Sequence, residues 1–494
     1  MTTNISTTPS IDTDQGAPRR RGLPRGVWTL AFTELWERYS FYGLQGILSF
    51  YLLYALVDGG LEVAPAAAAG IVGAYGGSVY LAQILGAWLG DRLVTPKSMV
   101  LWGAVVITAG HIVLAFVPDF LGLAIGLILI VLGTGALKTN ITSIVGFIVE
   151  GRSQQTRDVS FSYFYMSINI GAVVGPLSTG FAQNQWGFHF GFGLAAIGMI
   201  AALIQYLYSM KHLPERARLV NNPLPSKRLP LAIGIGVAAV AVIVIAAVSG
   251  MLRAENLSTT TTILALLAAA AYFITMSTSK QVTSDERRRV LAFLPLFLAA
   301  GIYFGLLFQK FTAISIMITE RIDLSIGSWT FPVAWITTAS PLAAVLITPL
   351  IARLWNLMGD RQPSPVTKFA IGLIQIGCAY FFLLLVSELA GDAFIPLALI
   401  ILFMAMAGSS EVFVGPIGLS VATRIGPQAF KSQVVGLNFL TLALGSSLSG
   451  LLGQLFTLID EPTYYIIVAV TGAVLGLALF LTRKPLSTAL NSGL

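Results

Sequence analysis

The 494-residue sequence contains little charge, one cysteine and few histidines. Asp, Glu, Lys and Arg together make up 10% of the residues, and there are three histidines. The single cysteine, Cys378, excludes a disulfide framework, and the Cys and His residues do not have the spacing of metal ligands. No histidine belongs to a recognisable catalytic motif with Ser or Asp. The sequence therefore predicts no metal or other cofactor site and argues against an enzyme, including an intramembrane one.

Hydrophobic residues, in contrast, make up 56% of the sequence, and its mean hydropathy is +0.82. So much apolar surface does not fit into one water-soluble core. Apolar runs of about 20 residues, the length that crosses a hydrocarbon layer of roughly 30 Å, recur along nearly the whole chain. These runs are continuous rather than alternating, which excludes a closed β-barrel. We predict an all-α polytopic membrane protein.

Hydropathy predicts fourteen membrane spans. They lie near residues 27–57, 67–93, 98–117, 120–149, 158–183, 188–210, 229–251, 260–278, 290–319, 329–356, 366–388, 393–423, 432–457 and 463–482. The sequence has no re-entrant filter segment and no repeated ring of charges, which argues against a channel.

Basic residues are concentrated in alternate loops between these spans. Four arginines precede the first span, and Arg or Lys residues follow the second, fourth, sixth and eighth spans. The positive-inside rule then predicts a multi-pass protein of the cell membrane, with both termini in the cytoplasm. The same pattern accounts for the net charge of +7, so a nucleic-acid partner is not expected.

The longest basic connection, 211–228, separates six spans from the rest, and the next two spans contain few polar residues. Six, two and six spans resemble the major facilitator fold, in which two six-helix bundles face each other across a central cavity, with an inserted hairpin. The predicted parts are a disordered cytoplasmic tail at 1–26, an N-terminal bundle at 27–210, a cytoplasmic linker at 211–228, the inserted transmembrane hairpin at 229–278, a second linker at 279–289, a C-terminal bundle at 290–483 and a cytoplasmic tail at 484–494.

The first span contains three ionisable residues, which are costly in lipid unless they face a partner or a water-filled cavity. Glu34, Glu37 and Arg38 are spaced i, i+3 and i+4, and Tyr42 and Gln45 continue the same helical stripe. One interpretation is an internal salt bridge that only neutralises itself. Two carboxylates share one guanidinium, however, so one carboxylate is left partly unpaired. We therefore expect this pair to take up and release a proton.

Three other spans each contribute a polar or charged residue. Lys138, Asn169 and Glu411 lie inside apolar runs. Isolated ions in a membrane indicate a functional site. For Asn169 a hydrogen bond between helices is an equally good interpretation.

The segments around these residues resemble signatures of the proton-dependent oligopeptide transporters. Glu34 to Gly43 matches the first-helix pattern E-x-x-E-R-F-x-Y-Y-G, with Tyr39 and Phe41 as aromatic exchanges. Three further patterns of that family, in its fourth, fifth and tenth helices, are matched by 133–140, 164–171 and 411–420, with Thr139 and Gly415 as single exchanges. The resemblance covers 27–483, and it places the chain in the peptide transporter branch of the major facilitator superfamily.

The resemblance implies roles for individual residues. The positions that would line the peptide pocket are Arg38, Tyr42, Tyr80, Lys138, Asn169 and Glu411. Lys138 would bind the peptide carboxylate and Glu411 its amino group. Glu34, Glu37, Arg38 and Glu411 would couple transport to protons. We accordingly expect a small peptide as substrate, the proton as coupling ion, the lipid bilayer as surroundings, and a functional monomer without an obligate protein partner.

Several pocket positions depart from the family pattern. The seventh helix of the family usually carries a tryptophan and, four residues later, a glutamate, and an arginine of the first helix pairs with that glutamate. Here these positions are Phe304, Phe308 and Gln45, an eighth-helix asparagine is Ser340, an eleventh-helix tryptophan is Asn438, and Lys310 is an additional cation. Because both members of the gate pair are replaced, no charge is stranded. The orientation of Lys310 is left open.

Two functions remain open on these grounds. The first is proton-coupled symport of di- and tripeptides into the cell by alternating access, which the intact first-helix signature favours. The second is transport of another solute by the same scaffold, such as a modified peptide or a small amphipathic metabolite, with weak or no proton coupling. The missing gate pair favours the second.

Overall fold

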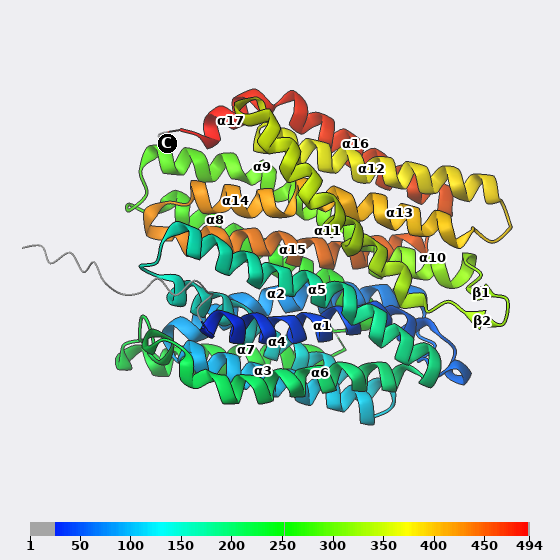
Figure 1. Ribbon diagram of the computed structural model, residues 1–494, viewed down its shortest axis with the longest axis horizontal. Helices are drawn as coiled ribbons and strands as arrows, with labels where there is room; N and C mark the ends of the chain where they lie inside the picture. The colour runs from blue at the N-terminus through cyan, green and yellow to red at the C-terminus, as the bar shows by residue number, and fades with distance from the viewer. Residues whose placement is uncertain (1–24, 251, 493–494) are drawn as a thin grey trace, which may run out of the picture.

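The computed structural model describes residues 25–250 and 252–492, and these residues are nearly all helical. The helices run along the long axis of the molecule, and the first six lie in the lower half of Figure 1. The described chain begins and ends at one side, here called the termini side, and a small β-hairpin marks the opposite side, here called the hairpin side. Of the disordered tail predicted at 1–26, residues 1–24 lie outside the described residues.

The first half consists of six long helices whose ends follow from local sequence. They are α1 (Arg25–Leu53), α2 (Pro65–Arg92), α3 (Pro96–Phe116), α4 (Asp119–Val149), α5 (Gln154–Trp186) and α6 (Phe188–Ser209). Proline occupies the first position of α2 and α3, where no backbone donor is needed. The side chains of Thr95 and Ser153 cap α3 and α5, and Gly187, at φ 95°, allows the turn between α5 and α6.

The second half contains the remaining core helices. They are α9 (Ser284–Leu307), α10 (Ala313–Arg321), α11 (Val333–Met358), α12 (Pro365–Ala390), α13 (Leu397–Ser409), α14 (Gly415–Ile425), α15 (Lys431–Phe456) and α16 (Glu461–Leu481), followed by the short α17 (Arg483–Leu490). Between α10 and α11, β1 (Ser325–Ile326) and β2 (Trp329–Thr330) form a two-stranded antiparallel hairpin. The all-helical prediction did not include this hairpin.

Two predicted spans are not continuous helices. The span expected at 290–319 is divided into α9 and α10 by a 3₁₀ turn, Phe308–Phe311, and the span expected at 393–423 is divided into α13 and α14 by another, Ser410–Phe413. Each nevertheless lies in one segment long and apolar enough to cross a membrane, Ser284–Arg321 and Leu397–Ile425, so both predicted spans are present. Hydropathy could not predict the breaks, because it measures apolar composition and not the continuity of hydrogen bonding. Interrupted helices inside membrane proteins occur where the backbone lines a cavity.

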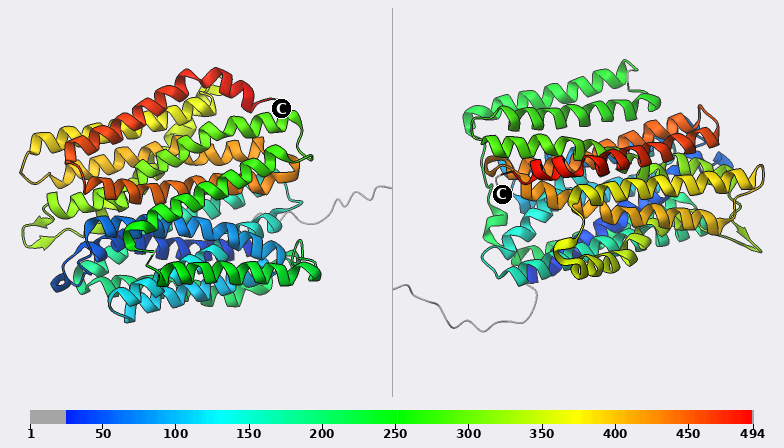
Figure 2. Two further views of the ribbon diagram at one scale, coloured as in Figure 1. Left: turned by 180° about the vertical axis from the view of Figure 1, so that it is seen from behind. Right: turned by 90° about the horizontal axis from the view of Figure 1, so that it is seen from above.

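The inserted pair consists of α7 (Leu229–Val248) and α8 (Leu257–Thr278). Helix α8 packs against α2, α15 and α9, and the Ser258 hydroxyl donates to the Gly70 carbonyl at 2.8 Å. Most described side chains of α7 are exposed. Both helices lie outside the two halves in the right-hand view of Figure 2. They are therefore peripheral to the centre of the molecule.

Twelve segments of the described chain are long and apolar enough to cross a membrane. Helices α1 and α5 are as long but contain more polar residues, so they fall outside that set. With these two included, the helices fit the fourteen predicted spans.

The linker between the halves packs onto the termini side of the first half. It forms 3₁₀ turns at Met210–His212, Glu215–Arg218 and Ser226–Arg228, and Leu213 and Ala217 are buried in the core of the first half. The Arg216 guanidinium pairs with Glu150. The linker is therefore anchored to the first half.

The two halves are packed together on the hairpin side. The Trp335 indole of α11 donates to the Leu177 carbonyl of α5 at 2.8 Å, and Asn184 donates to the Thr330 carbonyl at 3.1 Å. Helices α2 and α15 approach so closely that a methyl group at Gly73 would lie 2.5 Å from the Gly450 Cα. All of these contacts belong to the hairpin-side segments of their helices, so the halves are closed there.

Replacing Gly73 by Ala is expected to reduce transport about tenfold, because overpacking costs about 1–3 kcal/mol and the backbone of Gly450 cannot move aside as a side chain could. Gly436→Ala is a matched control in α15, since a methyl group there would meet only the Tyr272 hydroxyl at 3.8 Å. Initial transport rates of both variants in proteoliposomes measure the effect. Equal rates for the two variants would show that this close approach is not needed for closure.

Candidate functional site

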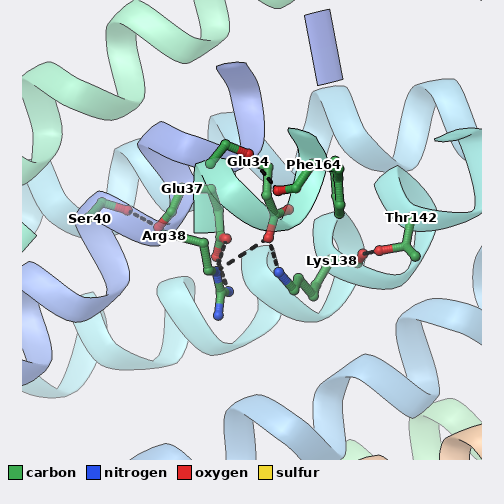
Figure 3. Close-up of polar contacts among 8 residues, drawn as sticks. Glu34, Glu37, Arg38, Ser40, Lys138, Thr142 and Phe164 are labelled. Atoms are coloured by element: carbon green, nitrogen blue, oxygen red, sulfur yellow. Dashed lines mark hydrogen bonds and ion pairs between the residues drawn. The ribbon is translucent and has the colours of Figure 1, made fainter. Parts of the chain in front are cut away.

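A cluster of buried charges lies on α1. The Arg38 guanidinium binds the Glu37 carboxylate through two hydrogen bonds, Nε to Oε2 at 2.5 Å and Nη2 to Oε1 at 2.6 Å. Arg38 Nε also lies 3.7 Å from Glu34 Oε1. Both carboxylate side chains have almost no exposed surface. The guanidinium is thus shared unequally, and Glu37 holds most of it (Figure 3).

A second cation reaches this cluster from α4. The Lys138 ammonium pairs with Glu34 Oε1, as Figure 3 shows. The other oxygen, Glu34 Oε2, is buried and has no hydrogen-bond partner among the described residues. The structure thus pairs Lys138, expected from the resemblance to bind the peptide carboxylate, with Glu34.

Glycines bring the helices that carry these charges close together. A methyl group at Gly171 of α5 would lie 2.7 Å from the Leu35 carbonyl of α1. A methyl group at Gly135 of α4 would lie 2.6 Å from the Ala82 carbonyl of α2. Small residues at such crossings allow backbones to approach in membrane bundles. The first half therefore holds the ion pairs within a tightly packed group of α1, α2, α4 and α5.

A cavity of about 180 Å³ lies between the two halves. The first half lines it with Tyr42, Gln45, Tyr80, Ile168, Asn169, Ala172 and Pro176, and the second half with Phe308, Lys310, Phe311, Thr337, Pro341, Ala344, Glu411, Leu442 and Ser446. The charge cluster of α1 is joined to it through Tyr42, whose ring centroid lies 5.8 Å from the Arg38 Cζ.

At the helix break, Phe308–Phe311, some backbone carbonyl groups lack the N–H donors that a continuous helix would provide. Side-chain hydroxyl groups donate hydrogen bonds to these carbonyls instead. The Leu306 carbonyl accepts from the Tyr380 hydroxyl at 2.9 Å, and the Lys310 carbonyl accepts from the Ser315 hydroxyl at 2.9 Å. The Ser49 hydroxyl of α1 donates to the Phe311 carbonyl. The break is thus held from three sides, and it places the Lys310 side chain in the cavity wall.

Removing the hydroxyl of Tyr380 is expected to destabilise the protein by about 1–3 kcal/mol, because the buried Leu306 carbonyl would lose its partner. The variant is Tyr380→Phe, and thermal unfolding in detergent measures the loss. Tyr208→Phe is the control, since that side chain is 75% exposed. If both variants unfold at the temperature of the parent, the break does not depend on this hydrogen bond.

The second break carries Glu411. Its turn, Ser410–Phe413, is supported by the Tyr303 hydroxyl, which lies 2.7 Å from the Ser410 Oγ. Gln375 reaches the same region, donating to the Ser409 Oγ at 2.6 Å. Pro416, which has no N–H, stands at the start of α14. Both cavity charges of the second half are therefore presented by interrupted helices.

Not all residues singled out in the sequence line this cavity. Tyr42, Gln45, Tyr80, Asn169, Phe308, Lys310 and Glu411 do. Phe304 is buried behind Phe308, with ring centroids 5.6 Å apart, and Ser340 is buried and accepts a hydrogen bond from Lys310. Glu34, Glu37, Arg38 and Lys138 form the adjacent charge cluster. Asn438 is not among the lining residues, and its side chain packs against Gly418 of α14.

Several lining residues were missed by the sequence analysis. Pro176, Thr337, Pro341 and Ser446 lie in spans that contain no charge near them. Prolines and hydroxyl residues within apolar runs are the signal that could have marked them, but such residues also serve packing and hydrogen bonding between helices.

Comparison with known proteins decides the family. A family model described as the POT family matches residues 97–467. The chain belongs to the POT family. It is 37% identical to the uncharacterized transporter YclF of Bacillus subtilis over 473 residues, which are 95% of this chain and 96% of that protein. It is 36% identical to the di-/tripeptide transporter of Lactococcus lactis subsp. cremoris over 480 residues, 94% of this chain and 96% of that one.

A solved structure of a POT peptide transporter in complex with sulfate has the same fold. Its TM-score is 0.89 at 34% identity, covering 94% of this chain and 96% of that one. The protein is thus a membrane transporter of the POT family and not an enzyme. As a POT-family chain it keeps the first-helix charge cluster, whereas neutral Gln45 and Phe308 stand in its cavity wall together with Lys310.

Proposed function

We propose that the protein is a symporter that carries di- and tripeptides into the cell together with protons. The observation that carries this proposal is the cavity between the two halves, with Glu411 at one wall and the Arg38 and Lys138 cluster beside the other. A zwitterionic peptide has one charge at each end, so its two termini would draw the halves together. The name of the Lactococcus lactis relative supports this substrate class.

Proton coupling in this proposal resides in the cluster on α1. Protonation of Glu34 would release Lys138, because the pair is held by one carboxylate oxygen. The freed ammonium is then available for the peptide carboxylate. Protonation of Glu37 would remove the negative charge that holds Arg38, although this pair is bound through both carboxylate oxygens. Glu411 takes the amino group and contributes a third site for protons.

Alternating access follows from the closure on the hairpin side. The basic loops lie on the termini side, so we assign that side to the cytoplasm and the hairpin side to the exterior of the cell membrane. The halves are closed at the exterior, and the cycle then opens them there by rocking about the central cavity. We further propose that one chain is the functional unit, surrounded by lipid.

A second candidate is transport of another solute with weak proton coupling. The neutral residues Gln45 and Phe308 in the cavity wall favour it, since no charged gate pair is present at these positions. A modified peptide or a small amphipathic metabolite is the substrate class in that case.

Counterflow of labelled dialanine in proteoliposomes tests the substrate class without any proton gradient. Unlabelled dialanine inside the proteoliposomes should drive the entry of labelled dialanine. Unlabelled dialanine added outside should compete with the labelled dialanine and reduce its entry. Dialanine amide, which lacks the free carboxylate, should compete weakly. No counterflow by folded protein, or competition by unrelated solutes alone, would favour the second candidate.

A further inference from the structure

Two serine hydroxyl groups form hydrogen bonds across the boundary between the two halves. The Ser49 hydroxyl of α1 donates to the Phe311 carbonyl of the second half. The Ser446 hydroxyl of α15 donates in the opposite direction, to the Gly73 carbonyl of α2, at 3.3 Å. Both serines are 3% exposed, and Phe311 and Ser446 line the cavity. These two hydrogen bonds are here called the hydroxyl clasp.

The contact of Ser446 differs from that of its neighbour in α15. Serine hydroxyls inside helices can donate to a carbonyl in the preceding turn of their own helix. Ser447 does so, donating to the Ala443 carbonyl at 3.0 Å. Ser446 extends to α2 instead, where a methyl group at Gly76 would collide with its Oγ. Its hydroxyl therefore occupies room that a glycine leaves on the facing helix.

Ser49 replaces a backbone donor that the first helix break removes. The Phe311 carbonyl belongs to the turn between α9 and α10, where a continuous helix would have supplied an N–H. A buried carbonyl without a partner is costly. Because Ser49 belongs to the first half, separation of the halves on the hairpin side would take this donor away. The hydrogen bond therefore stabilises the closed arrangement and not the open one.

This closure depends on neutral groups. No ion pair among the described residues joins the first half to the second. The side chains of Trp335 and Asn184 make the other hydrogen bonds between the halves on the hairpin side, and both are uncharged. Opening on this side therefore requires that neutral hydrogen bonds break, and the two serines supply those nearest to the cavity.

We propose that Ser49 and Ser446 are positioning residues of the transport cycle, which hold the exterior side closed and set the fraction of molecules that are open to the exterior. This inference rests on the proposed function, in which the halves alternate between two openings. Loss of a clasp hydroxyl raises the free energy of the closed arrangement, because a buried carbonyl loses a donor. In the open arrangement water reaches the same carbonyl, so the loss costs little there. Each loss therefore shifts the population toward the exterior-open arrangement.

Chemical labelling of one cysteine from outside the cell measures that fraction. Cys378 is the single cysteine of the chain, so Cys378→Ser gives a cysteine-free background. Ala344→Cys then places one thiol in the cavity wall, and the protein with these two substitutions is the reference protein. In intact cells, a thiol reagent that does not cross the membrane reaches this cysteine when the exterior side is open. The labelling rate therefore follows the open fraction.

Ser49→Ala, added to the reference protein, should raise the labelling rate about tenfold, because the Phe311 carbonyl loses the donor that replaces its backbone partner. Ser446→Ala should raise the rate about threefold, since the Gly73 carbonyl keeps the backbone donor of its own helix. Ser447→Ala is the matched control. Its hydroxyl stays within α15, so this variant should be labelled as fast as the reference protein.

Equal labelling of Ser49→Ala and the reference protein would overturn the inference. An equal rise for Ser447→Ala would also overturn it, because loss of any buried hydroxyl would then loosen the closure. Thermal unfolding in detergent shows whether each variant is folded, and if Ser49→Ala is not, the rise expected for Ser446→Ala decides. The labelling needs no substrate. Failure of dialanine counterflow would therefore contradict the proposed substrate and not the clasp.

Discussion

Replacing Glu37 by Gln is expected to abolish accumulation of dialanine driven by a proton gradient while counterflow continues. Gln keeps the shape of the side chain and can still accept a hydrogen bond from Arg38, but it cannot exchange a proton. Arg38 keeps an anion within reach, since its Nε lies 3.7 Å from Glu34 Oε1. The variant should therefore fold, bind and exchange peptide, and lose only the link between proton and peptide movement.

Accumulation and counterflow are measured on the same proteoliposomes, with Glu215→Gln in the exposed linker as the control. The control should accumulate dialanine as the parent does. If Glu37→Gln accumulates dialanine against its gradient as well as the parent, Glu37 is not a coupling residue. If Glu37→Gln loses both counterflow and accumulation, Glu37 is needed for folding or for peptide binding.

Replacing Lys138 by Met is expected to destabilise the protein by about 3–5 kcal/mol, the loss seen when one member of a buried ion pair is removed. The reason is the burial of Glu34, whose Oε2 already lacks a hydrogen-bond partner among the described residues. Without Lys138 the Glu34 carboxylate would keep only the more distant Arg38. Thermal unfolding in detergent measures the effect, with Lys227→Met, an exposed lysine of the linker, as the control.

The double variant Glu34→Gln/Lys138→Met separates pairing from other effects. Removing both charges leaves none stranded, so most of the stability should return. The difference between the stability loss of the double variant and the summed losses of the two single variants is the coupling energy between Glu34 and Lys138. It measures the interaction of the pair directly. Strictly additive losses would show that Glu34 and Lys138 do not stabilise each other.

The sequence predicted the members of the charge cluster but not their pairing. The spacing of Glu34, Glu37 and Arg38 places them on one face of a helix, and this requires only the helical period. Lys138 comes from another helix, and its partner depends on how α4 is rotated against α1. Helix α4 also packs closely on α2, where a methyl group at Gly135 would lie 2.6 Å from the Ala82 carbonyl, and the sequence does not specify this packing in three dimensions.

The helix breaks were the main structural feature that sequence analysis did not find. Lys310 and Glu411 lie in segments apolar enough to be predicted as continuous spans. The break depends on hydroxyl groups from distant helices, including Tyr380, which replace the missing backbone partners. Such tertiary hydrogen bonds leave no local pattern. The orientation of Lys310, which the sequence left open, follows from that break.

The sequence showed which residues depart from the family pattern. It did not show where these residues lie in the cavity. Gln45 and Phe308 both line the cavity, so two neutral residues stand at the positions where the family pattern has charges. Phe308 stacks on Phe304, at an angle of 26° between the rings. The wall is thus completed by aromatic packing.

Uptake of labelled dialanine into proteoliposomes, with and without an inward proton gradient, tests the central claim most directly. The account predicts that dialanine accumulates above its outside concentration only when the gradient is present, and that a protonophore or excess unlabelled dipeptide abolishes the accumulation. Uptake to the same level with and without the gradient would contradict proton coupling, and absence of uptake by folded protein would contradict peptide transport.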